Sequence, residues 1–476
     1  MSEKQITTQA ANGTLETLAG VVPDVPLGIT ILFSILLLLM IISLAFEEKL
    51  HAKKSIIVSV FAIVALILGT YFQNIPFGDV ILPGNHRVKI PVYITAVDWG
   101  VIAIILGSSI FVDVTSRSGL FTWIAIRLTK VSGGDPLKLL WYYCLMTVVF
   151  SAVLNNVTAM IIIGSLTAVS LSKLNQKHLL LGFLLTEALL TNIGGLLTLI
   201  SSVPNIIVGN AAGISFVDFF LKSSPFVIVA TIGTIFIGSK VFNIKKLETQ
   251  QQRDEAVQLI SGFDENDGIE SKAFFWFAAA MLLLFIIFIA STSVLPIASE
   301  LGMGFVALTF AAIMLLRYKS QVDQFYKSVD WDLLAFFVAL FVVINVMEYT
   351  EVLTLIGKGI SYLIGEGKNL QGTAMLLLSS AIASSVTDNI PLAAMLSKIL
   401  AAGSTASDSP LWWSVVFGAN LGGNITPIGS ASTLVAVTII HKHGLKLSFV
   451  DFVKKAGIFA ILQLILAVFY VLIFIY

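Results

Sequence analysis

Long uncharged stretches alternate with short charged ones along the whole chain. Residues 27–46 give 20 consecutive positions without a charge, which is enough for a helix to cross a hydrocarbon core of about 30 Å. Further apolar segments follow near 56–72, 99–116, 139–172, 179–213, 216–239, 273–292, 301–316, 332–348, 370–400, 411–440 and 456–475. The pattern predicts an all-α polytopic membrane protein.

Two of these segments, 139–172 and 370–400, are too long for a single crossing. A polar cluster interrupts each of them, Asn155-Asn156 in the first and Thr387-Asp388-Asn389 in the second. Irregular backbone at membrane depth is tolerated only where protein or a water-filled cavity surrounds it. We therefore expect both segments to form re-entrant hairpins, which leaves about ten spans plus two hairpins.

The distribution of basic residues predicts the orientation. When the chain is threaded with its N-terminus outside, most of the 28 Lys and Arg residues fall in inside loops, as the positive-inside rule requires. This predicts a multi-pass protein of the cell's inner (plasma) membrane with both termini outside. The predicted parts are an outside tail (1–26), two spans with an outside loop (27–96), a first repeat (97–242), a cytoplasmic linker (243–272), two connecting spans (273–328), and a second repeat with the last span (329–476).

Composition excludes several classes of protein. Only 12% of the residues are charged, 57% are hydrophobic, the mean hydropathy is +0.95 and the net charge is zero, which excludes a cytosolic enzyme, a secreted protein and a nucleic-acid binder. Cys144 is the only cysteine, so neither an intrachain disulfide nor a Cys-based metal site can form. No nucleotide-binding loop or catalytic constellation is present, so we expect no enzyme and no cofactor, apart from a transported Na⁺ at Asp388.

The two halves of the chain contain the same motifs in the same order. Asp98 and Asp330, each followed by Trp, are 232 residues apart, and Asn155 and Asp388 are 233 apart. The Asn-x-Gly-Gly motifs at Asn192 and Asn420 are 228 apart. Because the threading sends the chain inward after the first motif and outward after its counterpart, the repeats are predicted to be inverted. Inverted repeats with broken helices near the midplane are typical of secondary transporters.

Each half supplies one hairpin tip and one broken span, and these are the predicted binding elements. Gly and Pro interrupt the helices there and free backbone groups, while Asn, Ser and Thr supply neutral ligands. Small residues also let membrane helices pack closely, but four clusters in two matching pairs favour a binding site. The first-half candidates are Asn155, Asn156, Thr158, Glu187, Asn192, Gly194, Gly195, Thr198, Ser201, Ser202 and Asn205. The second-half candidates are Thr387, Asp388, Asn389, Asn420, Gly422, Gly423, Asn424, Thr426, Ser430 and Ser432.

Asp388 is the most informative of these residues, because a carboxylate at membrane depth is costly and is a functional candidate by default. It could bind Na⁺ or carry a proton. Glu187 precedes Asn192 by five positions and is a candidate for the same site, with a structural role as the equal alternative.

The motif Ser-Val-Thr387-Asp388-Asn389-Ile-Pro391 and the stretch from Gly418 to Ser432 resemble the second-half signatures of the ion transporter superfamily. The resemblance is to its branch of arsenite permeases, P proteins and NhaD-type sodium/proton antiporters, which have a citrate-transporter-like domain. It implies a mobile transport domain on a scaffold, an elevator-like movement and a homodimer. It also implies that the site is lined by Asp388, Asn389, Asn192, Asn420, Ser430 and Ser432.

The first half departs from the family pattern. The family usually has Asp at the position of Asn155, and its Gly-Asp-Pro-Pro-Asn stretch is Ser201-Ser202-Val203-Pro204-Asn205 here. Cation/proton antiport through Asp388 is the first expectation. A permease for an anion, oxyanion or carboxylate, coupled to H⁺ or Na⁺, is the alternative, and an ion channel is the competing class.

Overall fold

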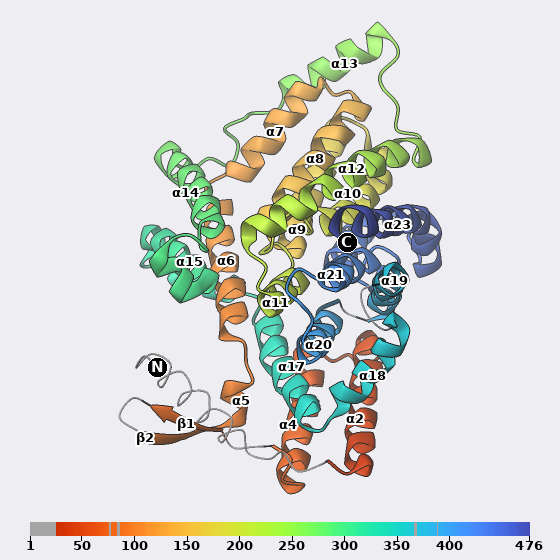
Figure 1. Ribbon diagram of the computed structural model, residues 1–476. Coiled ribbons are helices and arrows are strands. Elements are labelled where there is room, and N and C mark those ends of the chain that lie inside the picture. The colour runs from red at the N-terminus through yellow and green to blue at the C-terminus, as the bar shows by residue number, and fades with distance from the viewer. Residues whose placement is uncertain (1–24, 76–77, 83–85, 366–368, 388) are drawn as a thin grey trace, which may run out of the picture. The chain divides into compact units, whose positions relative to one another are not determined.

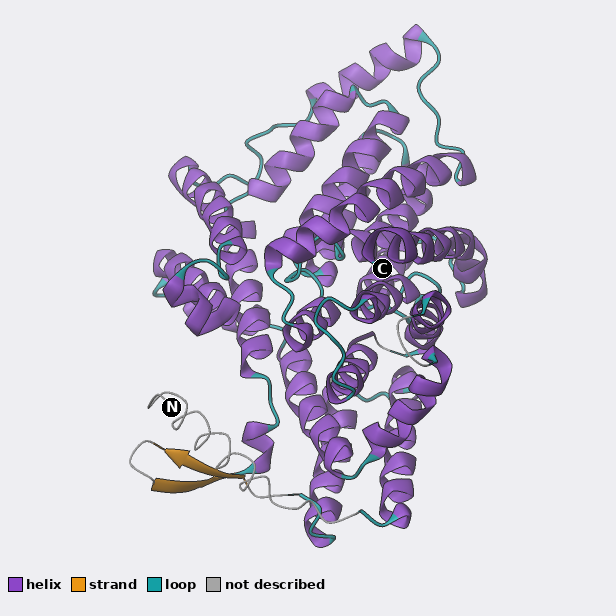
Figure 2. Cartoon of the chain, viewed as in Figure 1, coloured by secondary structure: helices purple, strands orange, loops and turns teal. Residues whose placement is uncertain are grey.

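A computed structural model describes residues 25–75, 78–82, 86–365, 369–387 and 389–476 (Figure 1). Figure 2 shows that the described chain is helical, except for one pair of strands. Ten of the described helices are long and apolar enough to cross a membrane. The predicted class of polytopic helical membrane protein is therefore confirmed, whereas Asp388 and most of the predicted N-terminal tail lie outside the described residues.

The chain divides into two compact units, and the smaller one consists of residues 1–97 and 338–356. Its elements are α2 (Leu27–Ala45), α3 (Glu47–Leu50), α4 (Lys54–Tyr71), β1 (Gly78–Leu82), β2 (His86–Ile90) and α5 (Val92–Thr95). The two strands pair antiparallel, with Gly78 opposite Ile90 and Leu82 opposite His86. Sequence analysis assigned the segment that contains β1 and β2 to an outside loop and did not predict the strands.

The larger unit consists of residues 98–337 and 357–476. Its helices are α6 (Trp99–Ser116), α7 (Leu120–Ser132), α8 (Pro136–Val153), α9 (Asn156–Lys173), α10 (Leu180–Gly194), α11 (Val203–Ala212), α12 (Phe216–Val241), α13 (Gln250–Ser261), α14 (Lys272–Ala290), α15 (Pro296–Leu315), α16 (Val322–Ser328), α19 (Leu370–Val386), α20 (Asn389–Ala402), α21 (Pro410–Gly422), α22 (Ala431–Lys442) and α23 (Phe449–Tyr470). The helices α17 (Trp331–Tyr349) and α18 (Val352–Ile364) each begin in one unit and end in the other.

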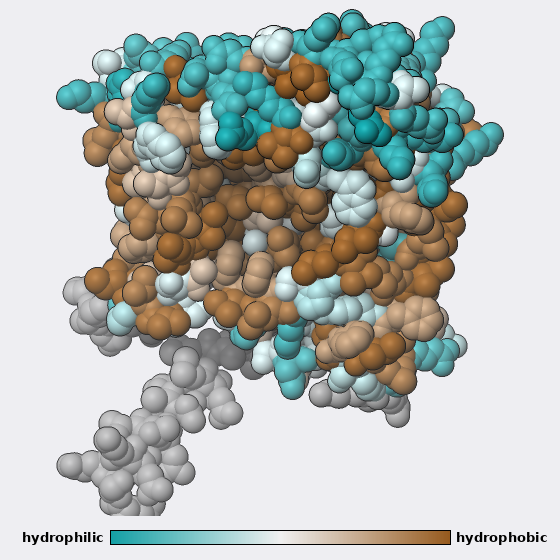
Figure 3. Space-filling model, turned by 90° about the horizontal axis from the view of Figure 1, so that it is seen from above, coloured by the Kyte–Doolittle hydropathy of each residue, from teal (hydrophilic) through white to brown (hydrophobic). Residues whose placement is uncertain are grey.

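Apolar side chains are exposed along the predicted spans. On α2, Ile31, Ile35, Leu38 and Ile42 are exposed, and their spacing of three and four residues places them on one face of the helix. Figure 3 shows hydrophobic residues over much of the face in view and hydrophilic residues gathered along one edge. Exposed apolar surface on this scale is what a lipid-facing helix presents.

The two segments that were predicted as hairpins are each broken at the predicted position. In the first, α8 ends at Val153 and α9 begins at Asn156, and in the second, α19 ends at Val386 and α20 begins at Asn389. Both α8 and α9 have 18 residues and count among the ten helices of spanning length. The ten observed helices are therefore not the same set as the ten predicted spans, and the re-entrant path stays a prediction.

Both predicted broken spans are confirmed as pairs of shorter helices. Residues 195–202 separate α10 from α11, and residues 423–430 separate α21 from α22. The two aspartates that open the halves cap helices. Asp98 accepts a hydrogen bond from the Val101 backbone N–H at 3.1 Å, and Asp330 accepts one from the Leu333 N–H at 3.0 Å.

The linker between the halves packs on α7 and α9 of the larger unit, to which it belongs. Phe263 is buried under the Lys173 ammonium, which lies 4.9 Å from its ring centre. The Glu265 carboxylate is paired with Arg127 at 2.8 Å and with Lys130 at 3.2 Å, both on α7. The hydrogen bonds that Arg127 and Lys130 donate lower the pKa of the Glu265 carboxyl.

This lowered pKa predicts pH-dependent docking of the linker. The contact is present above the ordinary pKa of a glutamate, about 4.3, and is lost as the pH falls through the lowered value, because protonation removes the charge that Arg127 and Lys130 bind. We expect Glu265→Gln to speed proteolytic cleavage within residues 243–271 at neutral pH. Glu255→Gln, on the exposed face of α13, is the matched control. Equal cleavage rates for the two variants would show that the ion pair does not hold the linker.

Candidate substrate and ion site

Each half of the larger unit closes its helix break with the same contacts. The Ser151 hydroxyl donates to the Thr191 carbonyl, and the Ser384 hydroxyl to the Ala419 carbonyl, both at 2.6 Å. Two further contacts match in the same way. The Thr198 hydroxyl donates to the Ala152 carbonyl, and the Thr426 hydroxyl to the Ser385 carbonyl. The hydroxyl groups of the hairpin tips and breaks thus hydrogen-bond backbone carbonyls at the ends of the interrupted helices.

Two glycines allow the breaks to approach the hairpins closely. A Cβ atom on Gly194 would lie 2.8 Å from backbone atoms of Val148, and one on Gly422 would lie 2.3 Å from the Ala381 carbonyl oxygen. Real Cβ atoms do not come this near to backbone, so any side chain here would push the helices apart. The two glycines occupy equivalent positions in the two motifs.

Asn192, at the end of α10, is the centre of a buried polar cluster. Its side-chain amide donates to Asn424 Oδ1 at 2.8 Å. Its own Oδ1 accepts from Ser430 at 3.0 Å, from Ser432 at 3.3 Å and from Asn156 at 3.4 Å. Asn192, Asn424 and Ser432 are fully buried. The cluster joins the first-half break to the second-half break through neutral side chains.

Asn420, at the end of α21, is the centre of a second cluster. Its Oδ1 accepts from the Ser202 hydroxyl at 2.7 Å, and its amide donates to Asn205 Oδ1 at 2.9 Å. Asn205 in turn donates to the carbonyls of Gly195 and Thr198. Since Ser202 of the first break binds Asn420, and Ser430 of the second break binds Asn192, the two halves exchange equivalent contacts.

Gln463 on α23 belongs to the first cluster and was missed by sequence analysis. Its Oε1 accepts from Asn424 at 2.8 Å, and its amide donates to the Thr234 hydroxyl of α12 at 3.0 Å. Gln463 is 4% exposed. The available signal was a single amide in an otherwise apolar last span, which is unusual at membrane depth.

The structure brings together most of the predicted residues, but not all in the same role. Asn155 caps α9 by accepting from the Thr158 backbone N–H at 2.8 Å. Thr387 donates back to the Ala383 carbonyl of its own helix. Asn389 is buried at the start of α20, and Ser201 closes its own loop by donating to the Gly195 and Thr198 carbonyls.

Glu187 lies in α10 apart from both clusters. It is fully buried, and its Oε1 accepts from the Thr167 hydroxyl of α9 at 2.7 Å. Its Oε2 has no hydrogen-bond partner. Among the described residues Glu187 is the one buried carboxyl group, and no described Lys or Arg is buried.

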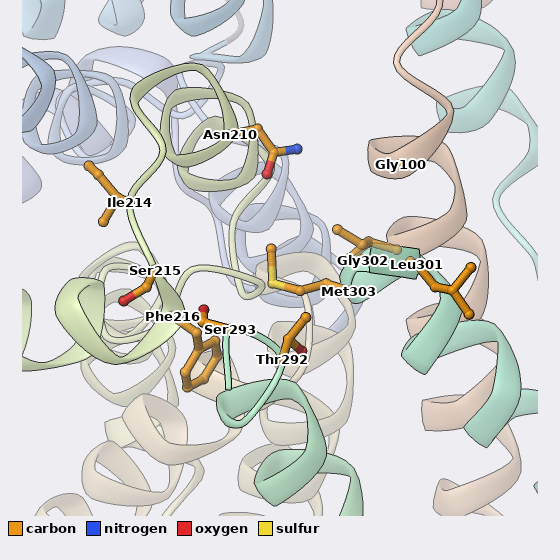
Figure 4. Close-up of a pocket in the computed structure, with 12 residues that line it drawn as sticks. Gly100, Asn210, Ile214, Ser215, Phe216, Thr292, Ser293, Leu301, Gly302 and Met303 are labelled. Atoms are coloured by element: carbon orange, nitrogen blue, oxygen red, sulfur yellow. The ribbon is translucent and has the colours of Figure 1, made fainter. Parts of the chain in front are cut away.

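A cavity of about 210 Å³ opens elsewhere in the larger unit. Figure 4 shows Ile214, Ser215 and Phe216 on one side of it and Leu301, Gly302 and Met303 on the other. Gly302 has a φ of 76° and interrupts α15 there. The cavity has no charged side chain in its lining and contains none of the predicted site residues, so sequence analysis did not predict it.

Helices of spanning length, together with two broken helices whose ends form a buried polar network, define a polytopic membrane protein of the transporter class. The chain belongs to the citrate transporter family, whose sequence profile matches residues 54–418. An uncharacterized transporter of Mycobacterium bovis is 31% identical over 383 residues, covering 79% of this chain and 86% of the relative. The human P protein is 24% identical and covers 75% of this chain and 51% of its own length. The resemblance predicted from the motifs is confirmed.

Solved structures share the fold. The MtrF protein of Neisseria gonorrhoeae, described among antimetabolite efflux pumps, gives a TM-score of 0.55 at 14% identity and covers 88% of this chain and 94% of its own. The YdaH transporter of Alcanivorax borkumensis gives a TM-score of 0.55 at 12% identity, and the match covers 89% of this chain and 98% of the YdaH chain. At this identity the likeness concerns the fold alone.

The buried amide chain predicts a stability effect at Gln463. The variant Gln463→Leu removes the donor to the Thr234 hydroxyl and the acceptor of one N–H of the Asn424 amide. This loss should lower the free energy of unfolding by about 1 kcal/mol. Thermal unfolding in detergent micelles measures this as a lowered midpoint. Gln258→Leu, on the exposed surface of α13, is the matched control. If Gln463→Leu unfolds at the wild-type temperature, the amide chain does not stabilise the bundle.

Proposed function

We propose that this protein is a secondary active transporter that exchanges Na⁺, or a similar monovalent cation, for protons. The observation that carries the proposal is the buried Asn192 cluster. It offers several neutral side-chain oxygens around one point, while no described basic side chain is buried beside it. Hard cations prefer oxygen ligands, whereas a buried anion is usually held by Arg or Lys.

The ligand oxygens would come from both halves of the chain. Asn192 Oδ1 belongs to the first half, and the hydroxyls of Ser430 and Ser432 belong to the second. These three oxygens are hydrogen-bonded to one another in the structure. A cation that enters would replace those hydrogen bonds, so its binding is expected to change the contact between the halves.

Asp388 supplies the charge in this proposal. It lies outside the described residues, between Thr387 and Asn389 of the second hairpin tip. In this proposal its carboxylate binds Na⁺ together with the neutral ligands when ionised and releases it when protonated, which is the competition that antiport requires. Asn155 at the matching place in the first half cannot ionise, so one tip carboxylate carries the exchange.

The proposed movement is an elevator-type exchange between two inverted repeats. It is supported by the matching contacts, above all the reciprocal pairs Ser202–Asn420 and Ser430–Asn192. Two similar halves of opposite orientation can exchange conformations and so open one site to either side. We place the protein in the inner membrane as a homodimer with both termini outside, as sequence analysis predicts.

An anion or carboxylate permease is the second candidate. The observation that favours it is that Ser202 and Ser430 occupy the N-cap positions of α11 and α22 but neither side chain caps its helix. Free N–H groups at a helix N-terminus attract anions. The description of the family as citrate transporters points in the same direction.

Everted membrane vesicles that hold a pH gradient, reported by a fluorescent dye, separate these proposals. We expect Na⁺ or Li⁺ salts to collapse the gradient with the wild type. The collapse should be lost in Asp388→Asn and reduced in Asn192→Ala, because the first removes the exchanged charge and the second removes a ligand. Asn266→Ala, an exposed asparagine of the linker, is the matched control.

The antiport proposal fails if no added cation moves protons at any working pH. In that case, a gradient that citrate collapses would favour the permease. Counterflow of labelled Na⁺ against an unlabelled gradient distinguishes a carrier from an ion channel, because a channel does not couple the movement of one ion to the return of another.

A further inference from the structure

Glu187 is a buried acidic group that the proposed exchange at Asp388 does not use. It lies five residues before Asn192 on α10, which places the two side chains about 7.5 Å apart along the helix axis. None of the hydrogen bonds described for the Asn192 cluster includes Glu187. The carboxyl group is therefore near the candidate cation site but is a separate site.

The charge state of Glu187 follows from what surrounds it. The carboxyl is fully buried, one oxygen accepts a single hydroxyl hydrogen bond from Thr167, and the other oxygen has no partner. A buried carboxylate with neither a counter-ion nor a full set of donors is much more costly than a neutral carboxyl group. The unpartnered Oε2 is the atom on which a proton would reside.

Among the residues that the structure describes, no buried charge on a neighbouring helix compensates for an ionised Glu187. Tyr143 and Cys144 of α8, which packs on α10, are both buried, and neither side chain carries a charge in its ordinary form at neutral pH. The charged side chains of the other helices that pack on α10 are exposed, among them Lys173 of α9, Lys240 of α12 and His441 of α22.

A row of hydroxyl groups extends from Glu187 toward the α7–α8 turn. Thr167, which binds the carboxyl, is one helical turn from Ser170 on the same face of α9. Ser170 is 2.7 Å from the Tyr143 hydroxyl, and that hydroxyl is 2.9 Å from Thr129 of α7. Hydroxyl groups both donate and accept, so the three linked hydroxyls of Ser170, Tyr143 and Thr129 form a segment that can pass a proton along.

We propose that Glu187 is a proton-binding site of this transporter, separate from the amide and hydroxyl clusters, that exchanges its proton with water through the hydroxyls of Ser170, Tyr143 and Thr129. In the step itself, a lone pair of Oε2 takes up a proton that a hydronium ion of the surrounding water supplies, and later returns it to water. No other bond is formed or broken. The coupling of this proton to cation transport rests on the proposed function, but the proton binding does not.

Infrared spectroscopy of the whole protein in nanodiscs tests the site without any transport measurement. At neutral pH, exposed carboxyl groups are ionised, so a protonated-carboxyl C=O band reports a buried acid. We expect this band in the wild type and its loss in Glu187→Gln. The band should shift in Thr167→Val, which keeps the acid and removes its donor. It should be unchanged in Glu255→Gln, on the exposed surface of α13.

Asp388→Asn distinguishes the two acids. If the C=O band is retained in Asp388→Asn, the proton belongs to Glu187. If the band is lost in Asp388→Asn and retained in Glu187→Gln, the proton belongs to Asp388 and the proposal is overturned. Absence of the band in the wild type at neutral pH overturns it as well. Because Thr167→Val still contains Glu187, a folding defect in Glu187→Gln does not leave the assignment undecided.

The route is tested by the rate at which the same band shifts after transfer into D₂O. We expect Tyr143→Phe, which removes the hydroxyl between Ser170 and Thr129, to slow this shift relative to the wild type. An unchanged rate would exclude the row as the route. If vesicles show no cation/proton exchange but the band behaves as expected, the antiport proposal fails and the proton site stands.

Discussion

Backbone groups that leave a helix inside a membrane must find hydrogen-bond partners within the protein, because lipid offers none. This requirement governs the structure around residues 195–202 and 423–430. Asn205 binds the carbonyls of Gly195 and Thr198, and Thr426 binds the carbonyl of Ser385. The side chains that close the breaks are therefore neighbours of the polar side chains that the proposed cargo would meet, Asn192, Ser430 and Ser432. Stability and binding depend on adjacent groups of the same two breaks.

The way the two halves share these groups gives the site its proposed behaviour. Ser202 and Ser430 each bind the asparagine of the opposite half, so neither break is complete by itself. The clusters are neutral, and neutral amide and hydroxyl pairs in membranes contribute only about 0.6 kcal/mol each on average. Contacts of this strength hold a closed state and still permit exchange for an ion. Glu187, buried and bound by one hydroxyl, adds an ionisable group that the neutral clusters lack.

The sequence predicts the helical class and both broken spans, because Gly, Pro and Asn in long apolar runs have few structural interpretations. It predicts less where a residue acts through a distant partner. Gln463 is a single polar residue in an apolar helix, and its bonds to Asn424 and Thr234 depend on packing between α12, α23 and the second break. Asn155 and Asn156 are adjacent and chemically identical, but one caps α9 and the other binds Asn192. The short amphipathic helices α7 and α18 were missed for a different reason, since their apolar faces are too short to indicate a span.

The claim that the Asn192 cluster is where the cargo binds requires that this buried cluster opens to water. Cysteine accessibility measures this directly. With the buried Cys144 replaced by alanine, Ser430→Cys places one thiol in the cluster. We expect a membrane-impermeant thiol reagent to label it from at least one side, and Na⁺ to slow the labelling. A thiol that is never labelled from either side, with or without Na⁺, would show that the cluster is a sealed structural core and would contradict the claim.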